Sequence, residues 1–124
     1  MSPPEEVPTL RLCSLAELPD GEALDAVGFP ADAPHRAGIF VVRHGAGVRA
    51  FINRCPHLGT PLNWTPDRFL DLARRHIVCA THGAVFRVDD GFCLSGPCEG
   101  DSLERVLTEV RDGNVFVADW QHSD

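Results

Sequence analysis

Two short motifs in the sequence combine cysteine and histidine at spacings that suit metal binding. One is a Cys-x-His motif at residues 55–57, and the other is a Cys-x-x-His motif at residues 79–82. A glycine follows each motif, Gly59 after the first and Gly83 after the second. Thiolates and imidazoles are ligands for zinc, iron and copper rather than for magnesium or calcium. The predicted ligands are Cys55, His57, Cys79 and His82.

Two metal chemistries fit this ligand set. Two cysteines with two histidines can form a tetrahedral zinc site. The same four side chains can also hold one type of [2Fe–2S] cluster, with both thiolates on one iron and both imidazoles on the other. A glycine beside each motif lets backbone N–H groups approach a sulfide without a Cβ in the way, which zinc does not require. The residues therefore favour the cluster, and a zinc-binding interaction module remains the alternative.

Composition limits the classes of protein that fit. A chain of 124 residues predicts one domain, expected over residues 9–120, with flexible tails at 1–8 and 121–124. The net charge is −7 and no basic stretch is present, so nucleic acid is not an expected partner. No apolar run reaches the ~20 residues of a membrane span, and the N-terminus lacks the pattern of a secretory signal. We expect a cytoplasmic protein whose cysteines are ligands or free thiols.

Short runs of β-branched and aromatic residues predict strands. Both ligand motifs directly follow such runs, which predicts that they lie on loops at hairpin tips. Asp89-Asp90-Gly91 and Asp112-Gly113-Asn114 are typical of hairpin turns. The sum is seven or eight strands in a small antiparallel all-β sandwich or barrel. The predicted strands cover residues 10–12, 38–43, 48–52, 76–78, 84–88, 92–94, 106–110 and 115–117.

Two segments do not show a strand pattern. Residues 14–34 are rich in proline and glycine, which predicts loop with at most a short helical turn near residues 22–26. Residues 63–75 lie between the ligand motifs, and Pro66-Asp67 is interpreted as the start of a short helix that ends at Arg75.

The two motifs together resemble those of the Rieske [2Fe–2S] family. The similarity covers residues 55–62, residues 79–86 and a downstream Gly96-Pro97, which resembles the family's loop over the cluster. It extends from about Ile39 to Val117, and the linker at residues 58–78 is longer than is common in the family. The resemblance implies a Rieske β-fold and one cluster per chain. It also implies that both cysteines bind the buried iron and both histidines bind the outer iron.

Differences from the Rieske proteins of respiratory complexes indicate the kind of carrier. Those proteins have an extra cysteine in each ligand loop, joined as a disulfide, where this chain has Thr60 and Ala80. They also place serine and tyrosine hydroxyls near the cluster, where this chain has Ala84 and Phe86. Fewer hydrogen bonds to the cluster predict a reduction potential nearer about −150 mV than +300 mV.

The resemblance implies a soluble, ferredoxin-like one-electron carrier between a flavin reductase and an oxygenase or another oxidoreductase. The chain is too short for an oxygenase catalytic domain as well, and we predict no catalytic residues. Two alternatives remain open besides zinc: a non-catalytic subunit similar to the nitrite-reductase small subunit, and a redox sensor. Cys93 and Cys98 are interpreted as a core thiol and a loop thiol rather than as a redox pair.

Overall fold

The computed structural model describes residues 10–27, 38–45, 47–56, 61–63, 67–80 and 83–120. Within these ranges the chain forms strands and one short 3-10 helix, which confirms the predicted all-β fold. The expected tails, at 1–8 and 121–124, lie outside the described residues. The elements are β1 (Leu10–Ser14), η2 (Leu15–Glu17), β2 (Ala23–Val27), β3 (Ile39–His44), β4 (Gly47–Ile52), β5 (His76–Val78), β6 (Val85–Arg87), β7 (Cys93–Ser95), β8 (Arg105–Arg111) and β9 (Asn114–Trp120).

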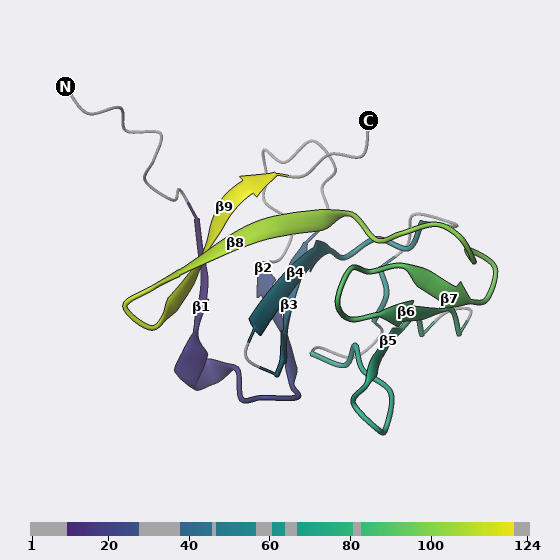
Figure 1. The fold of residues 1–124 in the computed structure, drawn as a ribbon, viewed down its shortest axis with the longest axis horizontal. Coiled ribbons are helices and arrows are strands. Elements are labelled where there is room, and N and C mark those ends of the chain that lie inside the picture. Colours follow the sequence, from purple (N-terminus) through teal and green to yellow (C-terminus); the bar gives the residue numbers. More distant parts are fainter. Residues whose placement is uncertain are drawn as a thin grey trace.

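The strands form two antiparallel sheets (Figure 1). The larger sheet has the order β1-β9-β8-β4-β3-β2, and the smaller has the order β5-β6-β7. The predicted hairpins β3–β4 and β8–β9 both lie in the larger sheet. Asp112 and Gly113 turn the chain between β8 and β9 with φ values of 51° and 77°. A turn with two positive φ values suits the twist of a two-residue hairpin.

Alternate residues of β3 face two separate apolar cores. Phe40 and Val42 pack into the core that includes residues of both sheets, whereas Ile39 and Val41 pack into the core on the opposite face. Side chains of a strand alternate between faces, so one strand can serve both cores. All four side chains are at most 1% exposed. The first core also contains the two predicted thiol ligands.

The helical turn expected near residues 22–26 is wrong, because residues 23–26 belong to β2. The strand pairs with β3, where Ala23 lies opposite Val42 and Asp25 lies opposite Phe40. The free edge of β3 supplies hydrogen-bond partners to this backbone. A pairing between segments this distant in sequence outweighs the local preference of a proline- and glycine-rich region.

The helix expected from Pro66 through Arg75 is also wrong. Pro66 lies outside the described residues, and the described part of the segment forms turns. Asp67 and Arg74 have φ values of 66° and 59°, in the left-handed region that a right-handed helix does not use. The Asp71 carboxylate accepts a hydrogen bond from the N–H of Arg75 at 2.9 Å, an alternative to helical bonding.

Packing and hydrogen bonds to other elements, rather than helical hydrogen bonds, hold the described residues of this segment, 67–75. The ring of Phe69 stacks on Phe40 with centroids 4.1 Å apart, and the N–H of Val78 donates to Phe69 O at 2.8 Å. Asp25 and Asp67 exchange hydrogen bonds, each carboxylate accepting from the other's backbone N–H at 2.7 and 2.8 Å. The segment between the ligand motifs is therefore tied to β2 and to the core.

A charged pair closes the β6–β7 turn. The Arg87 guanidinium donates two hydrogen bonds to the Asp90 carboxylate, at 3.0 and 2.8 Å, and the Phe92 N–H donates a third at 3.1 Å. The hydrogen bonds from Arg87, followed by the one from the Phe92 backbone, lower the pKa of Asp90 to about 2.

Because this folded-state pKa lies below the unfolded value of about 3.9, the pair stabilises the fold most above about pH 4. The contribution falls as the pH drops toward 2. We expect Asp90→Asn to lower the free energy of unfolding at pH 7, with a difference from wild type that shrinks below pH 4. Urea unfolding at a series of pH values measures this difference. Asp89→Asn, one residue away, is the matched control, and a difference that persists unchanged at low pH would contradict the prediction.

Candidate metal centre

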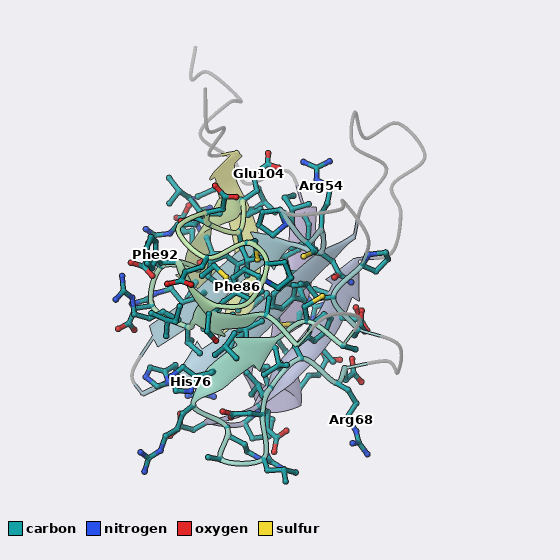
Figure 2. All side chains as sticks on the ribbon, turned by 90° about the vertical axis from the view of Figure 1, so that its right-hand side faces the viewer. Arg54, Arg68, His76, Phe86, Phe92 and Glu104 are labelled. Atoms are coloured by element: carbon teal, nitrogen blue, oxygen red, sulfur yellow. The ribbon has the colours of Figure 1, made fainter. Side chains whose placement is uncertain are left out.

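The first ligand loop, residues 53–62, begins where β4 ends. The Ile52 N–H donates to Glu104 O at 2.9 Å, and the Asn53 N–H donates to Gly38 O at 2.8 Å, so backbone bonds fix the strand end. Cys55 follows with 1% of its surface exposed. Arg54 points outward and pairs with the Glu104 carboxylate, and both side chains lie at one edge of the molecule (Figure 2). The cysteine therefore faces the core while its neighbour faces solvent.

Asn53 closes the base of this loop, a role that the sequence analysis missed. Its side-chain oxygen accepts a hydrogen bond from the Leu62 N–H at 2.7 Å, and its side-chain nitrogen donates to Asn63 Oδ1 at 2.8 Å. Asn63 in turn donates to the Asp25 carboxylate at 3.0 Å. One amide side chain thus joins the two ends of the loop, and β2 supports it from outside.

The second ligand loop, residues 79–84, follows β5. The Cys79 N–H donates to Ala84 O, and the Gly83 N–H donates to Cys79 O, both at 2.8 Å. Gly83 has a φ of 73°, which glycine adopts without strain. Cys79 has no exposed surface. The predicted position of this motif after a strand is confirmed, with the thiol pointing into the shared core.

A direct backbone hydrogen bond joins the two ligand loops. The Ala80 N–H donates to Leu62 O at 2.7 Å. Cys55 and Cys79, the two described members of the predicted ligand set, belong to the same buried core. His57 and His82 lie outside the described residues, and their assignment as ligands stays a prediction.

A third loop packs against the second ligand loop. We call residues 94–98 the covering loop. A Cβ built on Gly96 would lie 2.7 Å from the Ala84 Cα and 3.0 Å from its Cβ. Gly96 also has a φ of 105°, a conformation that other residues rarely adopt. Close approach and backbone angle both require glycine here, consistent with the covering role that the sequence resemblance implies.

The covering loop also brings further sulfur atoms close to the first ligand loop. The Sγ atoms of Cys93 and Cys98 are 3.1 Å apart, and both residues are buried. Burial, followed by the thiols of Cys93 and Cys55, raises the pKa of the Cys98 thiol. The Cys98 thiol therefore interacts with both the Cys93 thiol and the thiol of Cys55, a predicted ligand. The sequence placed Cys98 on a loop but gave no signal that it meets these two sulfurs.

The donor set fits a sulfur-ligated iron centre. Cys55 and Cys79 are buried thiols in an apolar core, and soft thiolates select zinc or iron–sulfur centres. The glycine contact between Gly96 and Ala84 shapes the same region by bringing a third loop close without a side chain between. Within the described ranges, no three side chains of ligand type converge as a separate metal site. The two cysteines with the two predicted histidines therefore form the candidate centre.

Two buried positions beside the second ligand loop lack hydroxyl groups. Ala84 and Phe86 have no exposed surface and belong to the same core as the two thiol ligands. In the sequence comparison above, these two positions match the serine and tyrosine of Rieske proteins in respiratory complexes. Neither the Ala84 nor the Phe86 side chain can donate a hydrogen bond.

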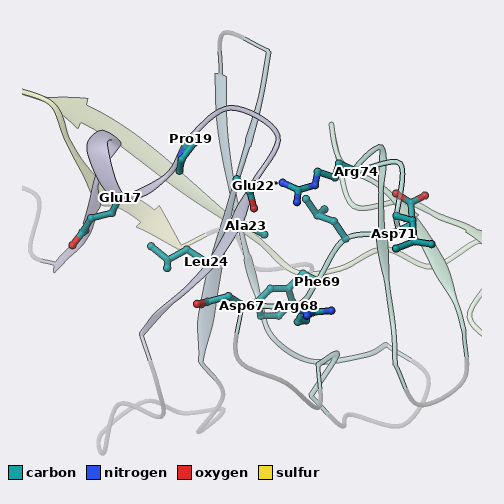
Figure 3. Close-up of a pocket in the computed structure, with 12 residues that line it drawn as sticks. Glu17, Pro19, Glu22, Ala23, Leu24, Asp67, Arg68, Phe69, Asp71 and Arg74 are labelled. Carbon is teal, nitrogen blue, oxygen red and sulfur yellow. Dashed lines mark ion pairs between the residues drawn. The ribbon is translucent and has the colours of Figure 1, made fainter.

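A cavity among the described residues, shown in Figure 3, is not lined by these thiols. It has a volume of about 540 Å³ and lies between β2 and residues 67–74. The Arg74–Glu22 ion pair lies within its lining, and neither Cys55 nor Cys79 lines it. The cavity is therefore separate from the two described thiols of the candidate metal centre. No helix among the described residues is long and apolar enough to cross a membrane.

Comparison with protein families identifies the class. A family model described as the Rieske [2Fe-2S] domain matches residues 9–118. The chain therefore belongs to the Rieske [2Fe–2S] domain family. Membership implies a Rieske-type [2Fe–2S] cluster as the cofactor.

Solved structures with the same fold include ferredoxins of oxygenase systems. The chain is 28% identical to a chain in the complex of reduced oxygenase and oxidized ferredoxin in carbazole 1,9a-dioxygenase, with a TM-score of 0.72 over 93% of this chain and 96% of that chain. It is 25% identical to the ferredoxin of carbazole 1,9a-dioxygenase from Nocardioides aromaticivorans IC177, with a TM-score of 0.67 over 91% and 98%. A Sphingomonas yanoikuyae B1 ferredoxin shares the fold at 24% identity, with a TM-score of 0.67 over 89% and 97%. No curated protein matches the chain.

Proposed function

We propose that this chain is a one-electron carrier that passes electrons from a flavin reductase to an oxygenase or another oxidoreductase. One Rieske-type cluster per chain is held by Cys55, His57, Cys79 and His82. The supporting observation is the pair of buried thiols on two ligand loops that a backbone hydrogen bond joins. The similarity to ferredoxins of carbazole 1,9a-dioxygenase favours an oxygenase as the electron acceptor.

The bound cluster supplies reversible one-electron chemistry. The protein's own residues hold the ligands and exclude water. Asn53 fixes the base of the first ligand loop, and the Ala80–Leu62 hydrogen bond holds the second loop against it. Ligand loops whose ends are held in this way need little rearrangement when the charge of the centre changes, which suits repeated electron transfer.

The charge of the chain supports a basic partner. The net charge of −7 and the absence of lysine make association with an acidic partner unfavourable. We propose a basic docking face on the redox partner, with association that weakens as salt increases. We further propose a cytoplasmic location and a domain that extends over residues 9–120.

Electron paramagnetic resonance of the dithionite-reduced protein, with iron and sulfide analysis of the same sample, tests this function. We expect a rhombic signal whose average g value lies below that of all-cysteine clusters, with about two irons and two sulfides per chain. A silent sample that contains zinc would contradict the proposal and support a zinc-binding module. Co-purification with a large flavin- or haem-containing subunit would support a subunit role similar to the nitrite-reductase small subunit.

The missing hydroxyl at Phe86 yields a prediction about the reduction potential. We expect Phe86→Tyr to raise it, because a hydroxyl donor to a sulfur ligand stabilises the reduced centre. A hydrogen bond of about 1–2 kcal/mol corresponds to roughly 40–90 mV for one electron. Phe92→Tyr is the control, because Phe92 is partly exposed beneath Arg87. Protein-film voltammetry measures both variants, and equal potentials would show that the ring of Phe86 is not directed at the ligands.

A further inference from the structure

Two thiols outside the predicted ligand set form a close pair. Cys93 lies at the start of β7 and Cys98 lies at the end of the covering loop. Their Sγ atoms are 3.1 Å apart, and the two residues are at most 2% exposed. Cys93 Sγ also lies 3.2 Å from Ser95 O. The pair therefore has a defined geometry inside the protein.

Backbone hydrogen bonds maintain this geometry independently of the sulfur atoms. The Cys93 N–H donates to Asp101 O at 2.7 Å, and the Gly100 N–H donates to Cys93 O at 3.2 Å. The Asp101 N–H donates to Cys98 O at 2.9 Å. These bonds hold residues 98–101 against the start of β7 and place Cys98 beside Cys93. A disulfide has an S–S length of about 2.05 Å, so the two sulfurs need to approach by only about 1 Å.

From this arrangement we propose that Cys93 and Cys98 are an oxidisable pair that forms an intramolecular disulfide with hydrogen peroxide. In the first step the Cys93 sulfur, as the thiolate, attacks the peroxide O–O bond, forms a sulfenic acid and releases hydroxide, which takes up the proton lost by the Cys93 thiol and becomes water. In the second step the other sulfur displaces the sulfenic hydroxyl group, which leaves with the second thiol proton as a second water. Each sulfur loses one electron, and the two peroxide oxygens gain two.

The modification would act directly on the environment of the metal centre. It converts residues 93–98 into a closed ring that contains Gly96, and Gly96 contacts Ala84 of the second ligand loop. It also removes the thiol hydrogen of Cys98, whose sulfur lies near Cys55. We expect the disulfide to shift the reduction potential of the cluster. This consequence rests on the proposed function, whereas formation of the disulfide does not.

Tryptic mapping tests the pair directly, because trypsin releases Cys93 and Cys98 in one peptide and every other cysteine in a different peptide. The chain has no lysine, so trypsin cleaves only after arginine. Residues 88–105 form one peptide that contains Cys93 and Cys98 and no other cysteine. Cys13, Cys55 and Cys79 fall in three other peptides, at residues 12–36, 55–68 and 76–87. The cluster-loaded protein is treated with a graded series of peroxide concentrations, alkylated under denaturing conditions and digested.

We expect the peptide 88–105 to lose the mass of two hydrogen atoms, to resist alkylation, and to regain both alkylation sites after reduction with dithiothreitol. This loss should occur at peroxide concentrations below those at which the Cys13 peptide is oxidised. Cys93→Ser and Cys98→Ser should each leave the remaining thiol of that peptide open to alkylation. Two free thiols in peptide 88–105 at every concentration that oxidises Cys13 would overturn the proposal. A cross-link between peptides 88–105 and 55–68 as the main product would also overturn it, because it would pair Cys98 with Cys55.

Iron content and the paramagnetic resonance spectrum of the same samples separate this proposal from the proposed function. A disulfide in a protein without iron would uphold the pair and contradict the electron-carrier assignment. An intact cluster spectrum without the disulfide would support the electron-carrier assignment and contradict the proposed Cys93–Cys98 pair. A cross-link between peptides 55–68 and 76–87 would report loss of the cluster from its cysteine ligands, and it is read separately from the Cys93–Cys98 product.

Discussion

Cys55→Ser and Cys79→Ser are each expected to abolish the [2Fe–2S] cluster. Iron should fall from about two per chain to near zero, and the paramagnetic signal of the reduced protein should disappear. A serine hydroxyl is not deprotonated at neutral pH and is a harder ligand than a thiolate, so it does not replace the sulfur at iron. Iron analysis and the spectrum of each purified variant measure the effect.

Cys13→Ser is the matched control for these variants. Cys13 is also a buried thiol, 1% exposed, but it belongs to the core on the other face of the larger sheet. Its replacement makes the same chemical change without touching a ligand loop. We expect it to retain iron. Full iron in Cys55→Ser, or equal loss of iron in all three variants, would contradict the ligand assignment.

The histidine assignments are tested by a change of ligand type. His82→Cys keeps a ligand at that position but exchanges imidazole for thiolate. If His82 binds iron, we expect the average g value to move toward that of all-cysteine clusters. An unchanged spectrum would show that His82 is not a ligand. The same reasoning applies to His57→Cys, and the two variants provide the test for residues that lie outside the described part of the chain.

The sequence predicted the parts of the site that depend on local patterns. Both cysteines follow a short apolar strand and precede a glycine, and the structure places both on loops after strands. Hairpins with glycine in the turn were also predicted, because the positive φ of a residue such as Gly113 leaves a clear signal in the sequence. These features need only neighbouring residues to be recognised.

Features that depend on distant pairings were not predicted. β2 exists because β3 offers it a free edge, and nothing within residues 22–26 shows that edge. Asn53 is an ordinary polar residue in the sequence, but in the structure it binds Leu62 across the loop. The Cys93–Cys98 contact depends on how Asp101 returns to Cys93, which a spacing of five residues does not reveal.

The covering loop leads to the second large expected effect. Gly96→Ala should destabilise the fold by about 2–6 kcal/mol. The strained φ of 105° accounts for about 1–3 kcal/mol, and the contact of the new Cβ with the Ala84 backbone adds about 1–3 kcal/mol. Because the neighbouring atom at 2.7 Å is a backbone Cα, a side-chain rotation cannot relieve the contact. Urea unfolding of the variant and of wild type measures the difference.

Gly100→Ala separates the two contributions. Gly100 has a similar φ of 94°, but a Cβ built there meets no atom within 4 Å. Gly100→Ala should therefore lower the free energy of unfolding only by the contribution of backbone strain. If Gly96 holds the covering loop against the second ligand loop, Gly96→Ala should also shorten the lifetime of the cluster in air, because a displaced loop admits water to the ligands. Equal cluster lifetimes in the two variants would show that the contact with Ala84 supports the fold without protecting the metal centre.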